Sequence, residues 1–154
     1  MPCVAVKLLL TALPLALLAA CSGHDGSVPG DAEDTRPFSE IGPDEEMRFT
    51  GTEPFWGGSV AGESLTYTTP ENIDGTTIAV DRFAGRGGVT WSGTLEGQSF
   101  DLMITPGHCS DGMSDRSYPF VATLQFGRRQ LDGCAWRATH PPADPAQEPS
   151  DSPA

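Results

Sequence analysis

The stretch TTIAVDRFAGRGGVTWSGTLEGQSFDLMI, from Thr76 to Ile104, decides the fold because apolar and polar residues alternate along its consecutive runs. In the first run Ile78 and Val80 fall on one face, opposite Ala79 and Asp81. A period of two is typical of strands that bury one face. The same alternation, here and nearer the C-terminus, predicts these further core residues: Val89, Trp91, Leu95, Phe100, Leu102, Ile104, Phe120, Ala122, Leu124 and Phe126.

Short runs of this kind recur on both sides of the stretch at intervals of about eight to twelve residues, separated by turn residues, and predict an all-β domain. The expected strands are Met47–Thr50, Phe55–Ala61, Ser64–Thr68, Thr76–Arg82, Val89–Leu95, Ser99–Thr105, Pro119–Phe126 and Gln130–Arg137. Most connections are short, so we expect a small antiparallel meander of about eight strands. Closure removes exposed strand edges, which favours a closed or nearly closed barrel; a curled β-sandwich is the alternative. The large core residues favour a packed interior over a ligand cavity.

The N-terminus has the features of a bacterial lipoprotein signal peptide over residues 1–20. Lys7 precedes an apolar run from Leu8 to Leu18, and Ala19-Ala20 lead into Cys21. We expect a lipid such as palmitate on Cys21, which would anchor the protein to a membrane. The apolar run is too short for a transmembrane helix, which takes roughly 20 residues; an ordinary secretory signal cut elsewhere is the other alternative. Ser22, and not Asp, follows the cysteine, and by analogy with lipoprotein sorting this favours the outer membrane, facing the periplasm.

The segments on either side of the strands are poor in large apolar residues and are expected to be disordered. Residues 21–40 form an acidic tether, residues 41–139 the β domain, and residues 140–154 a Pro-rich acidic tail. After removal of residues 1–20, eight arginines face 21 acidic residues, a net charge of −13. Such acidity makes nucleic acid an unsuitable partner. It is consistent with solubility, or with attraction of a basic partner.

The cysteines predict one disulfide. Cys3 leaves with the signal peptide and Cys21 carries lipid, so Cys109 and Cys134 form an even pair in an oxidising compartment. No second cysteine pair is present and two of the three histidines lie in the tails, so we expect neither a metal site nor a cofactor.

Three segments resemble a family of uncharacterised bacterial envelope lipoproteins and membrane-associated proteins. They are GTEPFWGG at 51–58, CSDGMSDRSYPF at 109–120 and DGCAW at 132–136. The resemblance covers essentially the whole β domain. It implies a small secreted or lipid-anchored β domain with its two cysteines paired, and it implies no activity.

The first of these segments places two aromatic residues after a proline at the start of a strand. We expect Phe55 in the core, and Trp56 either in the core or at a wet edge that serves its indole N–H. A carboxylate beside buried aromatics needs a partner, so we expect Glu53 to approach Arg116. The hypothesis is that the two longer motifs touch, with Arg116 bridging toward Glu53 or Asp111.

The long connection from Thr105 to Tyr118 is the second candidate site. Its short polar side chains predict a tight loop that bonds its own backbone. A second interpretation is that the loop binds calcium, although the spacing of its acidic residues does not match a twelve-residue calcium loop. A third interpretation is a loop that presents Asp111, Met113 and Asp115 to a partner.

Catalysis has little support in the sequence, which carries no nucleophile motif, phosphate-binding glycine loop or arguable carboxylate pair. We therefore expect no enzyme, but a lipid-anchored envelope protein with a binding or structural role and an envelope protein as its partner. One alternative is an inhibitor of a basic cell-wall-degrading enzyme such as lysozyme, by analogy with other small anchored β-barrels. A small-molecule carrier with a hollow barrel is the second alternative.

Overall fold

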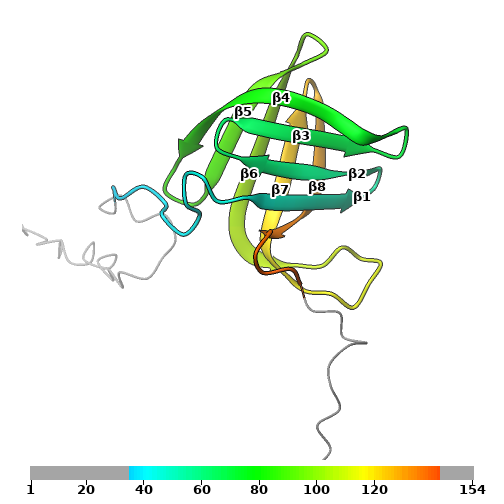
Figure 1. The fold of residues 1–154 in the computed structure, drawn as a ribbon. Helices are drawn as coiled ribbons and strands as arrows, with labels where there is room; N and C mark the ends of the chain where they lie inside the picture. Colours follow the sequence, from blue (N-terminus) through cyan, green and yellow to red (C-terminus); the bar gives the residue numbers. More distant parts are fainter. Residues whose placement is uncertain (1–34, 143–154) are drawn as a thin grey trace, which may run out of the picture.

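The structure, a computed structural model that describes residues 35–142, is a closed barrel of eight antiparallel strands in sequence order (Figure 1). Each strand pairs with the next, and β8 pairs with β1 to close the wall. The strands are β1 Met47–Thr52, β2 Phe55–Ala61, β3 Ser64–Thr69, β4 Asn72–Ala84, β5 Val89–Leu95, β6 Gln98–Cys109, β7 Tyr118–Phe126 and β8 Arg129–Arg137. The predicted all-β barrel is confirmed, and the sandwich alternative is not.

Two strands, β4 and β6, are longer than predicted by five residues or more. β4 begins at Asn72, so the connection expected over 70–75 is a turn at Pro70 and Glu71. The Asn72 side chain holds the start of the strand: its Oδ1 accepts from the Gly75 amide at 3.2 Å, and its Nδ2 donates to Thr76 Oγ1 at 3.0 Å. β6 continues past Thr105 to Cys109, through an irregularity in its pairing with β7. The long connection is therefore shortened to residues 110–117.

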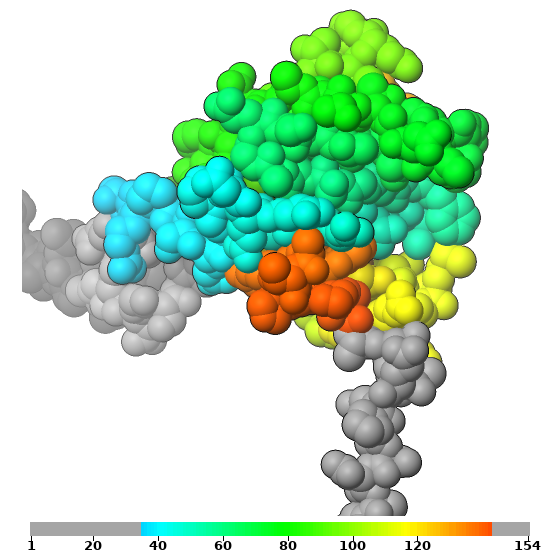
Figure 2. All heavy atoms as spheres, in the orientation of Figure 1, coloured from blue at the N-terminus to red at the C-terminus, as the bar shows by residue number. Residues whose placement is uncertain are grey.

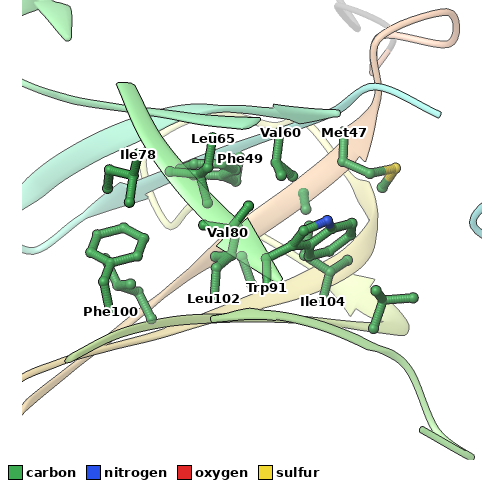
Figure 3. Packing of buried hydrophobic residues seen from close by; sticks show 14 of the residues in the cluster. Met47, Phe49, Val60, Leu65, Ile78, Val80, Trp91, Phe100, Leu102 and Ile104 are labelled. Carbon is green, nitrogen blue, oxygen red and sulfur yellow. The ribbon is translucent and has the colours of Figure 1, made fainter. Parts of the chain in front are cut away.

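The interior is packed with apolar side chains from the whole wall (Figure 3). Every core residue predicted from the alternation is buried except Leu95, which is partly buried and packs against the same cluster. Trp91 and Phe100 are among the largest fully buried side chains. Within residues 35–142 no polar or charged residue is fully buried. Burial of this apolar surface is the main force that stabilises the barrel.

The adjacent aromatics of the first motif separate, and the prediction that Phe55 lies in the core is wrong. Trp56 pairs with Gly51 and is 4% exposed, whereas Phe55 is 53% exposed. Successive side chains of a strand point to opposite faces, so two neighbours cannot both enter the interior. The inward place of Trp56 thus puts Phe55 on the outer wall.

The segment before β1 packs onto the barrel earlier than the expected domain start at Ile41. Phe38 packs against the core, and its amide donates to the Gly85 carbonyl at 2.7 Å. Ile41 itself is 1% exposed. The last residues of the expected tether therefore belong to the folded domain.

Two arginines hold this segment by its backbone. Arg82 Nη2 donates to the Ile41 carbonyl at 2.6 Å, and Arg137 Nη2 donates to the Glu40 carbonyl at 2.7 Å. Arg137 Nε also lies 2.9 Å from Glu45 Oε1. Both guanidinium groups also lie over rings of the core, at 5.8 Å from the Trp91 centroid and 4.7 Å from the Phe120 centroid. The segment closes one end of the barrel, seen at the left of Figure 1.

The expected signal peptide, the lipidated Cys21, most of the tether and the tail from residue 143 lie outside the described residues. The disulfide prediction is confirmed: Cys109 and Cys134 are bonded, with 5.6 Å between their Cα atoms. Because β7 lies between β6 and β8 in the wall, this bond joins strands that are not neighbours.

Candidate functional site

The long loop after β6 is organised around the carboxylate of Asp111. Its Oδ1 accepts from the amides of Met113 and Ser114 at 3.0 and 2.8 Å. Its Oδ2 accepts from the hydroxyls of Ser114 and Tyr118 at 2.7 and 3.0 Å. The loop is therefore self-satisfied, as the short polar residues of its sequence predict.

These donors change the ionisation of the groups concerned. Hydrogen bonds from the Ser114 amide and hydroxyl, and then from the Met113 amide, hold the pKa of Asp111 well below its usual range. Burial, followed by the hydrogen bond to Asp111, raises the pKa of the Tyr118 hydroxyl. Asp111 is thus a charged structural acceptor at neutral pH, with its oxygens already engaged by the loop.

The side chains at the tip of the loop are exposed. Met113 is 69% exposed, and Asp115 and Arg116 are also exposed. The Arg116 amide donates to the Ser114 hydroxyl at 3.3 Å, and its positive charge acts on Tyr118. The expected pairing of Arg116 with Glu53 or Asp111 stays a prediction.

The three motifs meet at one side of the barrel. Thr52 Oγ1, in the first motif, donates to the Asp111 carbonyl of the second at 3.1 Å. The disulfide joins Cys109 of the second motif to Cys134 of the third. The hydrogen bond to the Asp111 carbonyl confirms that the first two motifs touch, and the contact is made through Thr52. The Glu53 side chain is exposed.

Trp56 lies against two glycines of these motifs. A Cβ at Gly51 would overlap the indole Nε1, whereas a Cβ at Gly133 would overlap the Thr50 carbonyl oxygen and lie 3.0 Å from Cζ2 of the same ring. The ring also packs on Phe49, with 5.6 Å between centroids. Its Nε1 is buried and has no hydrogen-bond partner among residues 35–142. Trp56 is therefore a core side chain for which glycines on β1 and β8 leave room.

The outer wall above these residues carries a groove, which the strand register explains. Arg48, Ser59 and Thr66 form one row across β1, β2 and β3, and Trp136 of β8 continues it. The adjacent row runs from Thr50 through Gly57 to Thr68. Because Gly57 has no side chain, the wall is lowered between its neighbours.

Two clefts of about 380 and 310 Å³ make up this groove, and they share Gly58, Thr68 and Trp136. We call them together the Trp136 groove; the remaining lining residues are Arg48, Phe49, Thr50, Gly51, Phe55, Trp56, Gly57, Ser59, Thr66, Thr69, Pro70 and Ile73. Figure 2 shows this side of the molecule, with the end of β8 in orange beside β1.

The two ends of the groove differ in polarity. Phe55, 53% exposed, and Ile73, 80% exposed, make one end apolar. Arg48 and Ser59 make the other end polar. Trp136 lies between them, half-buried and packed against Tyr118 with 5.5 Å between ring centroids. A fixed aromatic ring between an apolar end and a polar end is typical of a surface that binds a ligand.

Sequence reasoning missed this groove, although it singled out Trp56 beneath it. The residues that form it come from five strands, β1 to β4 and β8, and meet only once the register is known. One signal was present: Gly57-Gly58 interrupts a strand, and such glycines often mark a close approach of another molecule or of the backbone.

Charge and metal-binding groups are sparse at the groove. Among its described lining residues the only charged side chain is Arg48, which lies 3.3 Å from Glu46 Oε1. Across residues 35–142 no group of three or more His, Cys, Asp or Glu side chains is placed to hold a metal ion. The same residues contain no helix that is long and apolar enough to span a membrane.

Comparisons of the chain with protein-family models, with curated proteins and with solved structures found no match.

Proposed function

We propose that this protein is a non-enzymatic binding module of the bacterial envelope, anchored by a lipid on Cys21, and that the Trp136 groove is its binding surface. The observation that carries the proposal is the groove itself, which joins a half-buried tryptophan to the exposed Phe55 and Ile73. Exposed apolar residues that gather around a concavity mark interaction sites.

The chemistry of the groove supports binding over catalysis. Its polar side chains are the hydroxyls of Thr and Ser and one arginine, and none of its described lining residues is His, Asp or Glu. General acid–base catalysis most often uses the side chains of His, Glu or Asp. The packed interior argues in the same way against a small-molecule carrier, because the core side chains fill the barrel (Figure 3).

The position of the chain start supports an anchored module. The described chain begins at the end of the barrel closed by Phe38 and Ile41, while the β1–β2 and β3–β4 turns beside the groove lie at the opposite end (Figure 1). Attachment through Cys21 would therefore leave the groove facing away from the membrane. A Cys21→Ala variant should lose incorporation of labelled palmitate and leave the membrane fraction; retention of both would contradict the anchor.

A capture experiment tests the binding role. The detergent-solubilised full-length protein is immobilised and exposed to envelope extract, beside a Phe55→Ala/Trp136→Ala variant and a Phe83→Ala control. Phe83 lies on β4, outside the groove, and is 70% exposed, so it matches Phe55 in chemistry and exposure. We expect a component that the wild type and the control retain and the double variant loses. If all three proteins retain the same components, the groove is not the binding surface.

The second candidate function is inhibition of a basic wall-degrading enzyme such as lysozyme. The exposed Met113 and Asp115 favour it, as does the acidity of the mature chain, which would steer a basic partner toward the loop. Inhibition of lysozyme by the wild type, weakened in an Asp115→Asn variant and unchanged in Phe55→Ala, would move the binding surface from the groove to the loop. If none of the three proteins inhibits lysozyme, this candidate function is ruled out.

A further inference from the structure

We infer that the ligand of the Trp136 groove is an uncharged saccharide chain. This inference rests on the proposed binding role of the groove and adds the class of ligand. The charge of the groove, the chemistry of its lining and its shape support a saccharide ligand.

Charge restricts the ligand first. The mature chain carries a net charge of −13, so anionic ligands are repelled over the distance at which its field acts. A cationic ligand would find no carboxylate among the described lining residues. The single arginine of the groove, Arg48, already pairs with Glu46. A neutral ligand avoids both the repulsion and the cost of burying an unpaired charge.

The lining then selects among neutral ligands. Trp136 and Phe55 offer aromatic faces, and five hydroxyls accompany them, from Thr50, Ser59, Thr66, Thr68 and Thr69. A hydroxyl both donates and accepts, so a row of them suits a ligand that is itself rich in hydroxyls. A pyranose ring has an apolar C–H face that packs on an aromatic ring, and hydroxyls around its edge. The groove supplies both kinds of contact.

The aromatic face is positioned before a ligand arrives. Trp136 is half-buried and packs against Tyr118, whose hydroxyl is in turn held by Asp111. A ring fixed in this way loses little conformational entropy on binding. The loop around Asp111 thus supports the groove from the side, although the carboxylate does not line it.

The shape favours a chain over a single compact molecule. Each cleft is at the low end of the range of roughly 300–1,000 Å³ that is usual for small-molecule sites. The two are joined at Gly58, Thr68 and Trp136 into one elongated groove along the wall. Successive sugar units would lie on Phe55 and on Trp136.

A proline-rich peptide is the competing occupant, because such peptides also dock on aromatic grooves. Residues 140–154 of this chain carry prolines, but also Asp144, Glu148 and Asp151. Such a segment would add negative charge beside an already acidic domain, and it would leave the row of hydroxyls without matching groups. The saccharide therefore fits the groove better.

Calorimetric titration of the detergent-solubilised full-length protein tests the inference. The probes are the β-1,4-linked tetramer of N-acetylglucosamine, maltotetraose and a decaproline peptide. We expect at least one oligosaccharide to bind. Trp136→Ala should weaken its affinity by about tenfold or more, as for a central aromatic contact, and Phe83→Ala should leave it unchanged. Phe55→Ala, at an exposed position where folding is not at risk, should weaken it as well.

Two outcomes would contradict the inference that the ligand is a saccharide. One is binding of decaproline through Trp136 with no binding of either oligosaccharide at millimolar concentration. The other is oligosaccharide affinity that neither Trp136→Ala nor Phe55→Ala changes. In the first case the groove still binds a ligand, so the proposed function stands while the ligand class is wrong. Loss of the proposed function itself would appear in the capture experiment, where no component would depend on Phe55 and Trp136.

Discussion

Removal of the disulfide should destabilise the barrel by a large and calculable amount. The variant is Cys109→Ala/Cys134→Ala. Alanine is chosen over serine because Cys134 is 1% exposed, and a serine hydroxyl there would add the separate cost of a buried polar group. The two alanines leave the contacts of the wall otherwise unchanged, so the measured effect is mainly that of the cross-link.

The magnitude follows from the sequence separation of 25 between the two cysteines. In the chain-entropy model, a closed loop of this length lowers the entropy of the unfolded chain enough to stabilise the folded state by about 3.5 kcal/mol at 25 °C. Domains of this kind have total stabilities of roughly 5–15 kcal/mol. For about 100 residues the loss corresponds to a melting temperature lower by about 15–25 °C.

Urea unfolding followed by circular dichroism measures the loss, with the free energy of unfolding extrapolated to zero denaturant. The control is the wild type in reducing agent, which should unfold at the same urea concentration as the variant. The variant itself should be insensitive to the reducing agent. A loss below about 1 kcal/mol would refute the reasoning, because the unfolded chain would then gain little freedom from breaking the bond.

Three further predictions concern single residues. Gly51→Ala should lower the free energy of unfolding by about 1–3 kcal/mol, because the new Cβ overlaps the Trp56 ring, and a melt that matches the wild type would contradict the close packing. Leu102→Ala, at a fully buried position, should cost about 2–5 kcal/mol, whereas Phe55→Ala should stay within about 0.5 kcal/mol; equal losses in chemical unfolding would place Phe55 in the core after all. The pKa of Asp111 is lower in the folded state than in the unfolded state, so its contribution is present at neutral pH and is lost as the pH falls below about 4. Hydrogen exchange at the Met113 and Ser114 amides, corrected for the intrinsic rate, should therefore quicken on acidification in the wild type and be fast at every pH in Asp111→Ala; protection that does not depend on pH would show that the carboxylate does not hold the loop.

The strands and the core were predictable because each depends on residues close together in the chain. Ile78 and Val80, or Leu102 and Ile104, are two positions apart and share a face wherever the strand lies. Phe55 and Trp56 show the limit of this reasoning. Hydrophobicity alone places both in the core, and only the pairing of Trp56 with Gly51 decides which of the two enters.

The rest of the molecule depends on contacts between distant residues, which no local pattern encodes. Phe38 and Ile41 lie in a segment without periodicity. They are held at the core by a hydrogen bond from the Phe38 amide to the Gly85 carbonyl and one from the Arg82 guanidinium to the Ile41 carbonyl. The groove needs Trp136 to lie beside Arg48 and the glycines of β2, an arrangement fixed by closure of the barrel. The loop around Asp111 was predictable in kind, because its bonds span three residues.

The hydrogen bonds from Arg82 and Arg137 to the carbonyls of Ile41 and Glu40 would have a mechanical consequence if the domain were held through the chain that precedes it. Tension along that chain reaches residues 40 and 41 before it reaches β1. At these residues the tension is shared between β4 and β8, which carry the two arginines. The backbone hydrogen bonds of β1 to its neighbours are therefore not broken one at a time. The barrel would yield to a pull on that chain only after two charge-assisted bonds had broken together, so the end of the barrel at which the described chain begins is built to bear load.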